Sequence, residues 1–252
     1  MMDLLAHFGP WRDLPFVVLD FETTGTDPDE DRAVEIAAAR FEEGTLVGSI
    51  GMRLNPGRPI PEGASAVHGI RDADVADCHP LESLLVASER LEADWAACRL
   101  RELVTGAVPV AYCERFDRPM LRAAEKRAGA RLVPEAWSTW IDPLTIVKVI
   151  EGDRVRFGKG AHKLGAVCER WGVTLDNAHA AEADAIATGR LLAKIGEKSV
   201  GRLTVSELIR RQREHAAKLE AGFQRWLARK KAKEAAAATA PTSAPTSAGA
   251  GA

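Results

Sequence analysis

The sequence predicts an α/β fold, a mixed β-sheet flanked by helices with a long amphipathic helix at the C-terminal end. Short apolar runs rich in β-branched residues come early in the chain, beginning with residues 16–19. Longer segments with apolar residues at helical spacing are interleaved later, and one of them, residues 180–195, is rich in alanine. Strands that come first and helices that are interleaved later are typical of a mixed α/β sandwich. A chain of 252 residues can form one such core with an appendage, and a second full domain is not expected.

Five strands are expected. The first is residues 16–19, which are apolar and lead into an acidic residue and a Thr-Thr-Gly turn. Residues 33–41 and 46–54 flank a polar turn that contains glycine, so they are expected to pair as an antiparallel hairpin. Residues 108–112 give a short fourth strand, and residues 139–142 give the last.

Helices are expected at residues 81–103, 120–128, 164–171 and 180–195. In the first of them Leu84, Leu91, Trp95 and Cys98 recur at helical spacing, which predicts one buried face. Pro119 is expected in an early helical turn, where proline is tolerated. Residues 55–77 are rich in Pro, Gly and Asp and are expected to form a loop that contains an unusual apolar insert, Val-His-Gly-Ile.

The C-terminal region has a composition of its own. Thr204-x-x-Glu207 is a capping box, and apolar residues from Val205 to Trp226 follow it near heptad spacing. The other face is basic and carries Arg210, Arg211, Arg213, Lys218, Arg225, Arg229, Lys230, Lys231 and Lys233. We therefore expect a domain at 1–198, a basic amphipathic helix within 199–234 and a disordered low-complexity tail at 235–252.

Net charge and cysteine usage exclude several classes of protein. The net charge is only −2, so affinity for a polyanion has to come from a local basic patch or from bound cations. The four cysteines are far apart and form no C-x-x-C pair, which argues against a zinc knuckle and against a disulfide framework. Neither a leader-like segment nor an apolar stretch long enough to span a bilayer is found. We expect a cytoplasmic protein with free thiols and no membrane partner.

Asp20 and Glu22 are the first candidate functional residues. Residues two apart in a strand project from the same face, so these carboxylates point together while Phe21 points into the core. Their repulsion and partial burial favour a neutralising cation, and hard divalent metals prefer such oxygen ligands. An acidic strand end exposed to water is the alternative for this pair alone. The Thr23-Thr24-Gly25 turn makes the motif more specific, because it can present N–H groups and hydroxyls to a phosphate or a sugar.

Two further motifs complete a pattern of four acids and one histidine. A strand that ends in small and polar residues leads to Phe116 and Asp117 at a helix start, and His179 precedes Asp184 by five positions. Five positions turn an ideal helix through about 500°, so the two side chains would not share a face. His179 is therefore expected to precede the helix, on its entry loop. Taken singly, Asp117 could be a helix N-cap, Asp184 a solvated residue and His179 a surface histidine.

The three motifs resemble those of the DEDDh group of DnaQ-like proofreading exonucleases, which share an RNase H-like fold. The resemblance covers most of residues 16–195 and does not extend beyond Lys198. Where members commonly have His-Asn, this chain has Tyr112-Cys113, which bears on hydrogen bonding near Asp117 and on the selection of substrate. The resemblance implies that the metal ligands are Asp20, Glu22, Asp117 and Asp184, and that these four and His179 are the catalytic residues.

Such a site implies a metal-dependent 3′-to-5′ exonuclease that cuts single-stranded nucleic acid, expected to be DNA, into nucleoside 5′-monophosphates. Two divalent ions, Mg²⁺ or Mn²⁺, would stabilise the attacking and leaving oxygens, and His179 would accept the proton of the attacking water. The terminal nucleotide is expected to touch Thr23, Thr24, His68 and Phe116, although His68 could equally be a loop-packing residue. An RNA-trimming enzyme and a non-catalytic module that binds nucleic acid or a polymerase remain alternatives, because the motifs do not reveal 2′-OH contacts.

Several other residues are given structural roles. Glu35 and Asp142 are expected to be structural acids, and Trp140 is expected in the core. The C-terminal helix is expected to dock on the domain, on a polymerase or on a second copy of the chain. The alternative is that its basic face holds single-stranded substrate through phosphates, in which case binding would weaken steeply with salt.

Overall fold

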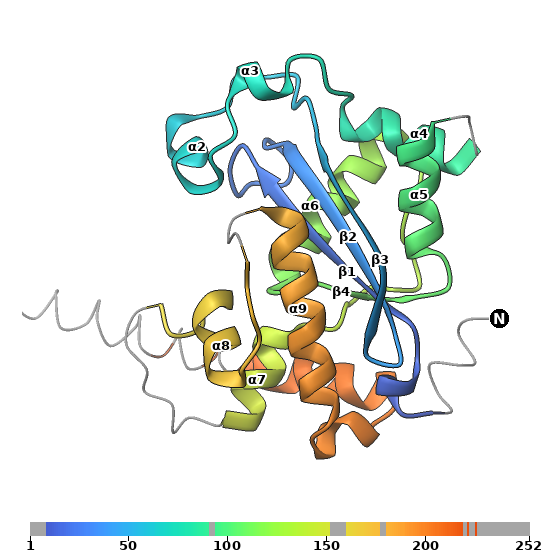
Figure 1. Ribbon diagram of the computed structural model, residues 1–252, viewed down its shortest axis with the longest axis vertical. Helices are drawn as coiled ribbons and strands as arrows, with labels where there is room; N and C mark the ends of the chain where they lie inside the picture. Colours follow the sequence, from blue (N-terminus) through green and yellow to red (C-terminus); the bar gives the residue numbers. More distant parts are fainter. Residues whose placement is uncertain are drawn as a thin grey trace, which may run out of the picture. The chain divides into compact units, whose positions relative to one another are not determined.

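The computed structural model describes residues 9–90, 94–151, 160–176, 180–218, 221 and 225. Contacts divide the chain into two units, Met1–Gln212 and Arg213–Ala252. In the first unit a mixed sheet in the order β3-β2-β1-β4 lies between two groups of helices (Figure 1). The predicted α/β class is confirmed.

The sheet is built around the long strands β1 (Phe16–Thr23), β2 (Ala33–Glu42) and β3 (Thr45–Arg53). Neighbours among these three pair antiparallel, whereas the short β4 (Val108–Val110) pairs parallel with β1. Glu43 and Gly44 join β2 to β3 with φ angles of 50° and 75°. Positive φ at both central residues is what a two-residue type I′ turn requires, so the predicted hairpin is confirmed.

The expected five-stranded sheet is wrong by one strand. The described sheet has four strands, and residues 139–142 contribute only an isolated parallel bridge between Ile141 and Val110. Ile141 donates its N–H to the Pro109 carbonyl at 3.0 Å and accepts the N–H of Ala111 at 3.1 Å. A ladder this short is not a strand, although it holds the position of one.

Alternate residues of β1 face two different cores. Val17, Leu19 and Phe21 pack in a cluster with the helices behind the sheet, which include α4 (Leu81–Arg90), α5 (Trp95–Val104) and α6 (Glu114–Ala128). Phe16 and Val18 pack in a second cluster with helices on the other side, which include α7 (Pro143–Glu151), α8 (Leu164–Trp171) and α9 (Ala181–Gly196). By the same alternation Asp20 and Glu22 belong to the face that α9 covers.

The helices match the expectations in part. The prediction for α8 is confirmed, and α9 begins one residue later than expected. The single helix expected at 81–103 is wrong: Asp94 caps α5 separately by accepting the N–H of Ala97 at 2.9 Å. Trp95 lies at that helix start with 74% of its surface exposed, so its predicted burial is also wrong. The expected loop at 55–77 contains the short helices α2 (Glu62–His68) and α3 (Asp72–Val75).

Helix α9 lies unusually close to the sheet. It packs across β1, β2 and β3 (Figure 1), and its alanine and glycine residues leave little between the two backbones. A Cβ on Gly189 would collide with the ring of Phe41 in β2. Only glycine fits there, so the position of α9 along the sheet is fixed.

The chain after α9 first returns to the core. The 3-10 helix η3 (Ser199–Arg202) receives the indole N–H of Trp11 on its Val200 carbonyl at 2.8 Å. The predicted capping box is confirmed, because Thr204 N–H donates to Glu207 at 2.9 Å and Glu207 N–H donates to the Thr204 hydroxyl at 3.2 Å. Residues 205–212 are helical, and in the second unit the described residues 213–218, 221 and 225 are also helical. The remaining positions of the predicted basic helix, and the tail at 235–252, lie outside the described residues.

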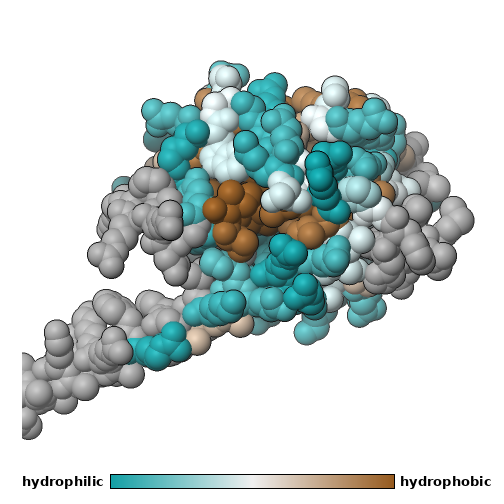
Figure 2. Space-filling view, turned by 90° about the horizontal axis from the view of Figure 1, so that it is seen from below, coloured by the Kyte–Doolittle hydropathy of each residue, from teal (hydrophilic) through white to brown (hydrophobic). Residues whose placement is uncertain are grey.

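The face seen from below is largely hydrophilic. An apolar area lies near its centre, and smaller apolar areas appear at its upper edge (Figure 2). Among the described residues, no helix has both the length and the apolar character needed to cross a membrane. The exposed large apolar side chains of the described residues are Val47, Val67, Trp95 and Ile150.

Candidate active site

Asp20 and Glu22 lie at the carboxyl end of β1. In the antiparallel register Asp20 faces Ala37, and Glu22 faces Glu35 directly. Their side chains project to the side of α9, while Phe21 between them is buried in the opposite cluster. The alternation expected from the sequence therefore places the two carboxylates together.

Asp184 joins them from the first turn of α9. One carboxylate oxygen each from Asp20, Glu22 and Asp184 lie within 4.8 Å of one another. Three carboxylates that converge at this distance form an all-oxygen donor set of the kind that hard divalent cations prefer. The chemistry of these residues therefore fits a divalent metal ion.

Glu35 sets the position of the helix that carries Asp184. The N-cap residue of α9, Ala180, has no side chain that can cap the helix. The Glu35 carboxylate of β2 instead accepts the N–H of Ala181 at 3.0 Å. This hydrogen bond ties the start of α9 to the sheet beside Glu22, and it supports the structural role expected for Glu35.

Asp117 comes from α6 and reaches β1 at the edge that β4 leaves unpaired, because β4 is short. The ladder between β1 and β4 ends at Val18 and Val110, so the rest of β1 has no strand beside it on that edge. Helix α6 begins in this space, and Asp117 in its first turn accepts the N–H of Phe21 at 3.2 Å. The Asp117 side chain is buried and lies beside Asp20, outside the group of three carboxylates.

The acids of the site hold protons tightly. Burial, followed by the charges of Asp184, Glu22 and Glu35, raises the pKa of Asp20 well above its ordinary value. Burial and the charge of Asp184 raise the pKa of Glu22 to about 7. The pKa of Asp117 is raised by burial and by Asp20. So many acids at one strand end are unfavourable when ionised, and a cation among them would relieve the repulsion.

The hydroxyls of the Thr23-Thr24-Gly25 turn are hydrogen-bonded to nearby residues of the same loop. Thr23 donates its hydroxyl to the Gly25 carbonyl at 2.6 Å. The Thr24 hydroxyl donates to Asp31 at 2.8 Å and accepts the N–H of Arg32 at 3.1 Å. A Cβ on Gly25 would collide with the Asp31 carboxylate, which explains the glycine. Both threonines are buried, so the structure places them as supports of the turn beside Glu22.

His68 and Phe116 come from two different helices, α2 and α6. His68 ends α2, and its Nδ1 accepts the N–H of Ile70 at 3.0 Å. Burial lowers the pKa of His68, and an interaction with the Thr23 backbone and the charge of Glu35 oppose that effect. Phe116 precedes Asp117 in α6 and is half-buried. His179 lies outside the described residues, two positions before α9 begins.

Cys113 and Asp142 support the start of α6 near Asp117, which agrees with the structural role expected for Asp142. Cys113 is the N-cap of α6 and has a left-handed backbone with φ of 73°, a conformation that asparagine and glycine adopt more easily. Its N–H donates to Asp142 at 3.0 Å, and the same carboxylate accepts the Leu144 N–H at 3.0 Å and the Thr145 hydroxyl at 2.7 Å. Asp142 before Pro143 is a helix-start signal, so the sequence could have indicated α7.

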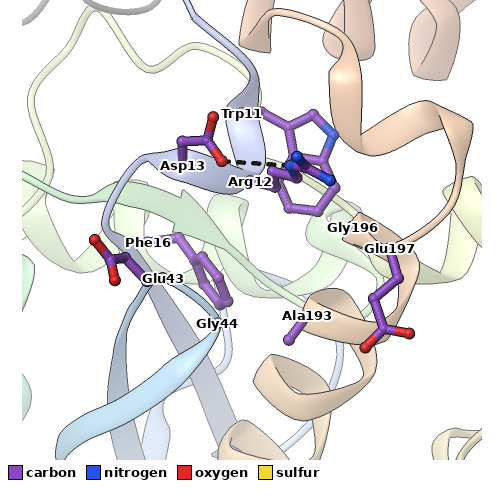
Figure 3. Close-up of a pocket in the computed structure, with 9 residues that line it drawn as sticks. All are labelled: Trp11, Arg12, Asp13, Phe16, Glu43, Gly44, Ala193, Gly196 and Glu197. Atoms are coloured by element: carbon purple, nitrogen blue, oxygen red, sulfur yellow. Dashed lines mark hydrogen bonds and ion pairs between the residues drawn. The ribbon is translucent and has the colours of Figure 1, made fainter.

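A cavity of about 510 Å³ lies away from these acids, at the start of β1 (Figure 3). Its lining includes Trp11 and Phe16 together with the charged side chains of Arg12, Asp13, Glu43 and Glu197. Arg12 is paired with Asp13 at 3.3 Å. The uncompensated charge is therefore negative, which does not suit a phosphate, and the cavity is separate from the candidate site.

Comparisons with known proteins agree with this geometry. The model of the RNase_T exonuclease family matches residues 17–192. A PolC-type DNA polymerase III of Streptococcus suis is 29% identical over 180 residues, which are 71% of this chain and 11% of that protein. A DNA polymerase III subunit epsilon-like protein of Rhodobacter capsulatus is 30% identical over 227 residues, 84% of this chain and 29% of that protein. The chain thus spans a small part of these relatives.

The fold also matches a solved structure. Exonuclease I of E. coli in complex with a dA16 oligonucleotide superposes with a TM-score of 0.60 at 22% identity, over 74% of this chain and 41% of that chain. At this identity the likeness concerns the fold. It agrees with the mixed sheet and the flanking helices described above.

Proposed function

Because this chain belongs to the RNase_T exonuclease family, we propose that it is a metal-dependent 3′-to-5′ exonuclease acting on single-stranded DNA. The observation that carries the proposal is the convergence of Asp20, Glu22 and Asp184 within 4.8 Å, with Asp117 beside them. These acids come from β1, α6 and α9, so the site exists only in the folded chain. Nucleoside 5′-monophosphates are the proposed products.

The carboxylates hold the metal. Asp20, Glu22 and Asp184 would hold one divalent ion, and Asp20 and Asp117 would hold a second, with Mg²⁺ or Mn²⁺ as the ions. The raised pKa values of Asp20 and Asp117 support this assignment, since acids that are costly to ionise alone become good ligands beside a cation. The bound ions supply positive charge to the attacking and leaving oxygens.

His179 is the proposed general base. An unperturbed imidazole has a pKa near 6.5, so it can accept a proton from water at neutral pH. The water oxygen forms a bond to phosphorus, the bond from phosphorus to the 3′ oxygen breaks, and that oxygen leaves as a hydroxyl after taking a proton. The released nucleotide keeps its 5′ phosphate. The spacing of His179 and Asp184 in the sequence supports the assignment.

Four residues are the proposed contacts of the terminal nucleotide. Phe116 offers an apolar surface next to Asp117, and His68 approaches from α2 on the side of Thr23. Because the hydroxyls of Thr23 and Thr24 are engaged within their turn, these residues act through the shape and backbone of the turn. Val67 beside His68 is 58% exposed and could add apolar contact with a base.

DNA is proposed as the substrate because of the relatives. Two of them are DNA polymerase III proteins, and the E. coli exonuclease I neighbour has been solved with a DNA oligonucleotide. A proofreading or repair role is proposed, and this kinship supports it.

A labelled-end assay tests the proposal. Single-stranded DNA and RNA of one sequence, labelled at the 5′ or the 3′ end, are incubated with Mg²⁺, with Mn²⁺ or with a chelator. We expect 3′-labelled DNA to release labelled mononucleotide at once and 5′-labelled DNA to shorten stepwise, only with metal. Asp184→Asn should abolish both, whereas Glu197→Gln, an exposed acid at the other end of α9, should not. Release from the 5′ end, or cleavage of RNA alone, would refute the DNA exonuclease.

The C-terminal helix is proposed to bind a polymerase or a second copy of the chain. The alternative, that its basic face binds DNA, is tested by titrating salt. Replacing Arg211 and Lys218 by glutamine should flatten the dependence of DNA affinity on salt if they touch phosphates. The matched control replaces Arg71 and Lys126, which are exposed elsewhere. An unchanged dependence of DNA affinity on salt would refute the DNA-binding alternative and favour the protein-binding role.

A further inference from the structure

Gln212 is a buried amide that binds the main chain of another segment. It is 4% exposed, and its side chain lies against the segment that carries Asp142. Its Nε2 donates to the Trp140 carbonyl at 2.9 Å, and its Oε1 accepts the N–H of Asp142 at 2.9 Å. The two bonds use one donor and one acceptor of the carboxamide in opposite directions.

This pair of bonds imitates one residue of a parallel strand. In a parallel ladder, one residue bonds to the carbonyl before and the N–H after its partner, which here are Trp140 O and Asp142 N on either side of Ile141. The other edge of Ile141 is bonded to Pro109 and Ala111. The carboxamide of Gln212 therefore closes the outer edge of the sheet at the position where the fifth strand was expected.

The segment fixed by Gln212 in turn holds the start of α6. The Asp142 carboxylate accepts the N–H of Cys113 at 3.0 Å, and Cys113 is the N-cap of α6 in a left-handed conformation. Asp142 itself is 4% exposed. Because protein interiors are closely packed, a shift of its backbone would be passed to the turn at Cys113.

Helix α6 carries the effect to the catalytic acids. Asp117 lies in its first turn, four residues after Cys113, and accepts the N–H of Phe21 at 3.2 Å. Phe21 lies between Asp20 and Glu22. One continuous path of hydrogen bonds and backbone therefore joins Gln212 to the acids of β1.

We propose that Gln212 is a positioning residue that sets the place of Asp117 through Asp142 and Cys113. The role rests on the proposed exonuclease function for its catalytic consequence. It goes beyond the family, because Gln212 lies outside the matched residues 17–192. This chain thus uses a residue after its family domain to fix an acid inside it. Losing a residue that supports a ligand commonly costs about 10- to 100-fold in activity or metal affinity.

Two substitutions separate positioning from simple stabilisation. Gln212→Met keeps the volume and removes both hydrogen bonds. Gln212→Glu keeps them only when protonated, because a neutral carboxyl has one donor and one acceptor, whereas the ionised form has no donor. Ala217→Met, at an exposed position of the C-terminal region, is the matched control.

The first readout is hydrogen–deuterium exchange in the full-length protein, on peptides covering residues 111–118 and 16–23. In Gln212→Met we expect faster exchange in both peptides, at temperatures where the protein stays folded. The second readout is turnover, with kcat about tenfold lower and KM little changed. Gln212→Glu should match the wild type at pH 5.5 and resemble Gln212→Met at pH 8, each compared with the wild type at the same pH.

The outcomes separate the two proposals. If Gln212→Met lowers the unfolding temperature but leaves both peptides and kcat as in the wild type, the positioning role is refuted. If the wild type shows no nuclease activity, the proposed function fails, and exchange together with Mn²⁺ affinity still decides the role of Gln212. Wild-type exchange and wild-type Mn²⁺ affinity in Gln212→Met would then refute it.

Discussion

Glu35 of β2 accepts the backbone N–H of Ala181 at 3.0 Å and at the same time faces Glu22 across the antiparallel pair of β1 and β2. One side chain thus caps the helix that brings Asp184 and borders the strand that brings Glu22. Two elements that are far apart in the sequence are fixed to each other at the point where their acids meet. Capping requires no negative charge at this position, because any oxygen acceptor there could accept the N–H of Ala181.

Replacing Glu35 tests this cap. Glu35→Ala should lower the free energy of unfolding by about 1 kcal/mol, because the first turn of α9 loses an N–H partner. Turnover should fall by about tenfold, because Asp184 in that turn loses its support. Glu35→Gln keeps an oxygen acceptor and should retain most of both. Equal losses in the two variants, measured by denaturant unfolding and by kcat, would show that Glu35 acts through its charge.

The stability of the metal-free protein should depend on pH through the acid cluster. The pKa of Glu22 is about 7 in the folded chain against 4.5 as the ordinary value. Between these values the native state binds more protons than the unfolded state, so the free energy of unfolding falls as pH rises. Mg²⁺ at pH 8 should restore what was lost, because it binds only the folded cluster.

Asp184→Asn provides the control for that experiment. Burial is the largest cause of the raised pKa of Asp20 and Glu22, and the charge of Asp184 is the next, so its removal should make the pH dependence shallower and abolish the gain from Mg²⁺. Denaturant unfolding from pH 5 to pH 8 with a chelator measures both proteins. A wild-type stability that falls no more steeply with pH than that of the variant would contradict the role of the acid cluster.

His179→Ala should separate chemistry from metal binding. A general base typically contributes on the order of 10²- to 10⁴-fold to turnover, so kcat should fall within that range. The affinity for Mn²⁺, measured by calorimetry, should remain close to that of the wild type. If metal affinity falls as much as turnover does, His179 is a ligand and not a base.

Cys113→Asn should stabilise the protein. A left-handed backbone costs an ordinary residue about 1 kcal/mol or more, and asparagine tolerates it better. We expect a gain of about 1 kcal/mol in the free energy of unfolding, with the Asp142 hydrogen bond retained. Cys113→Val should be destabilising, because a β-branched side chain fits a positive φ poorly. Thermal unfolding of both variants measures this, and a gain for valine would contradict the backbone argument.

Local patterns predicted the parts of the fold that depend on neighbouring residues. Short stretches of sequence were enough to predict the apolar run of β1, the hairpin turn and the boundaries of α8, because each depends on a local pattern. Asp20 and Glu22 converge for the same reason. Asp184 could be joined to them only through the resemblance, since no local pattern says which helix covers which face of a sheet.

The expectations failed at two places, one decided by a neighbouring residue and the other by a distant one. Trp95 has helical spacing from Leu84, but Asp94 starts a new helix and turns the tryptophan outward. Residues 139–142 have the composition of a strand, but only Ile141 pairs with Val110. On the other edge of this segment the hydrogen bonds are made by the side chain of Gln212 and not by a strand. No reading of residues 139–142 alone could reveal a partner seventy positions away.

The early end of β4 has a consequence for how this chain can change. An insertion that extended β4 along β1 would give the Phe21 N–H a backbone carbonyl as its acceptor. Asp117, which accepts that N–H now, would be displaced. The proposed activity would then be lost with every acidic residue still present in the sequence. Inactive descendants of such a protein could therefore escape notice in any comparison that checks side chains and ignores strand length.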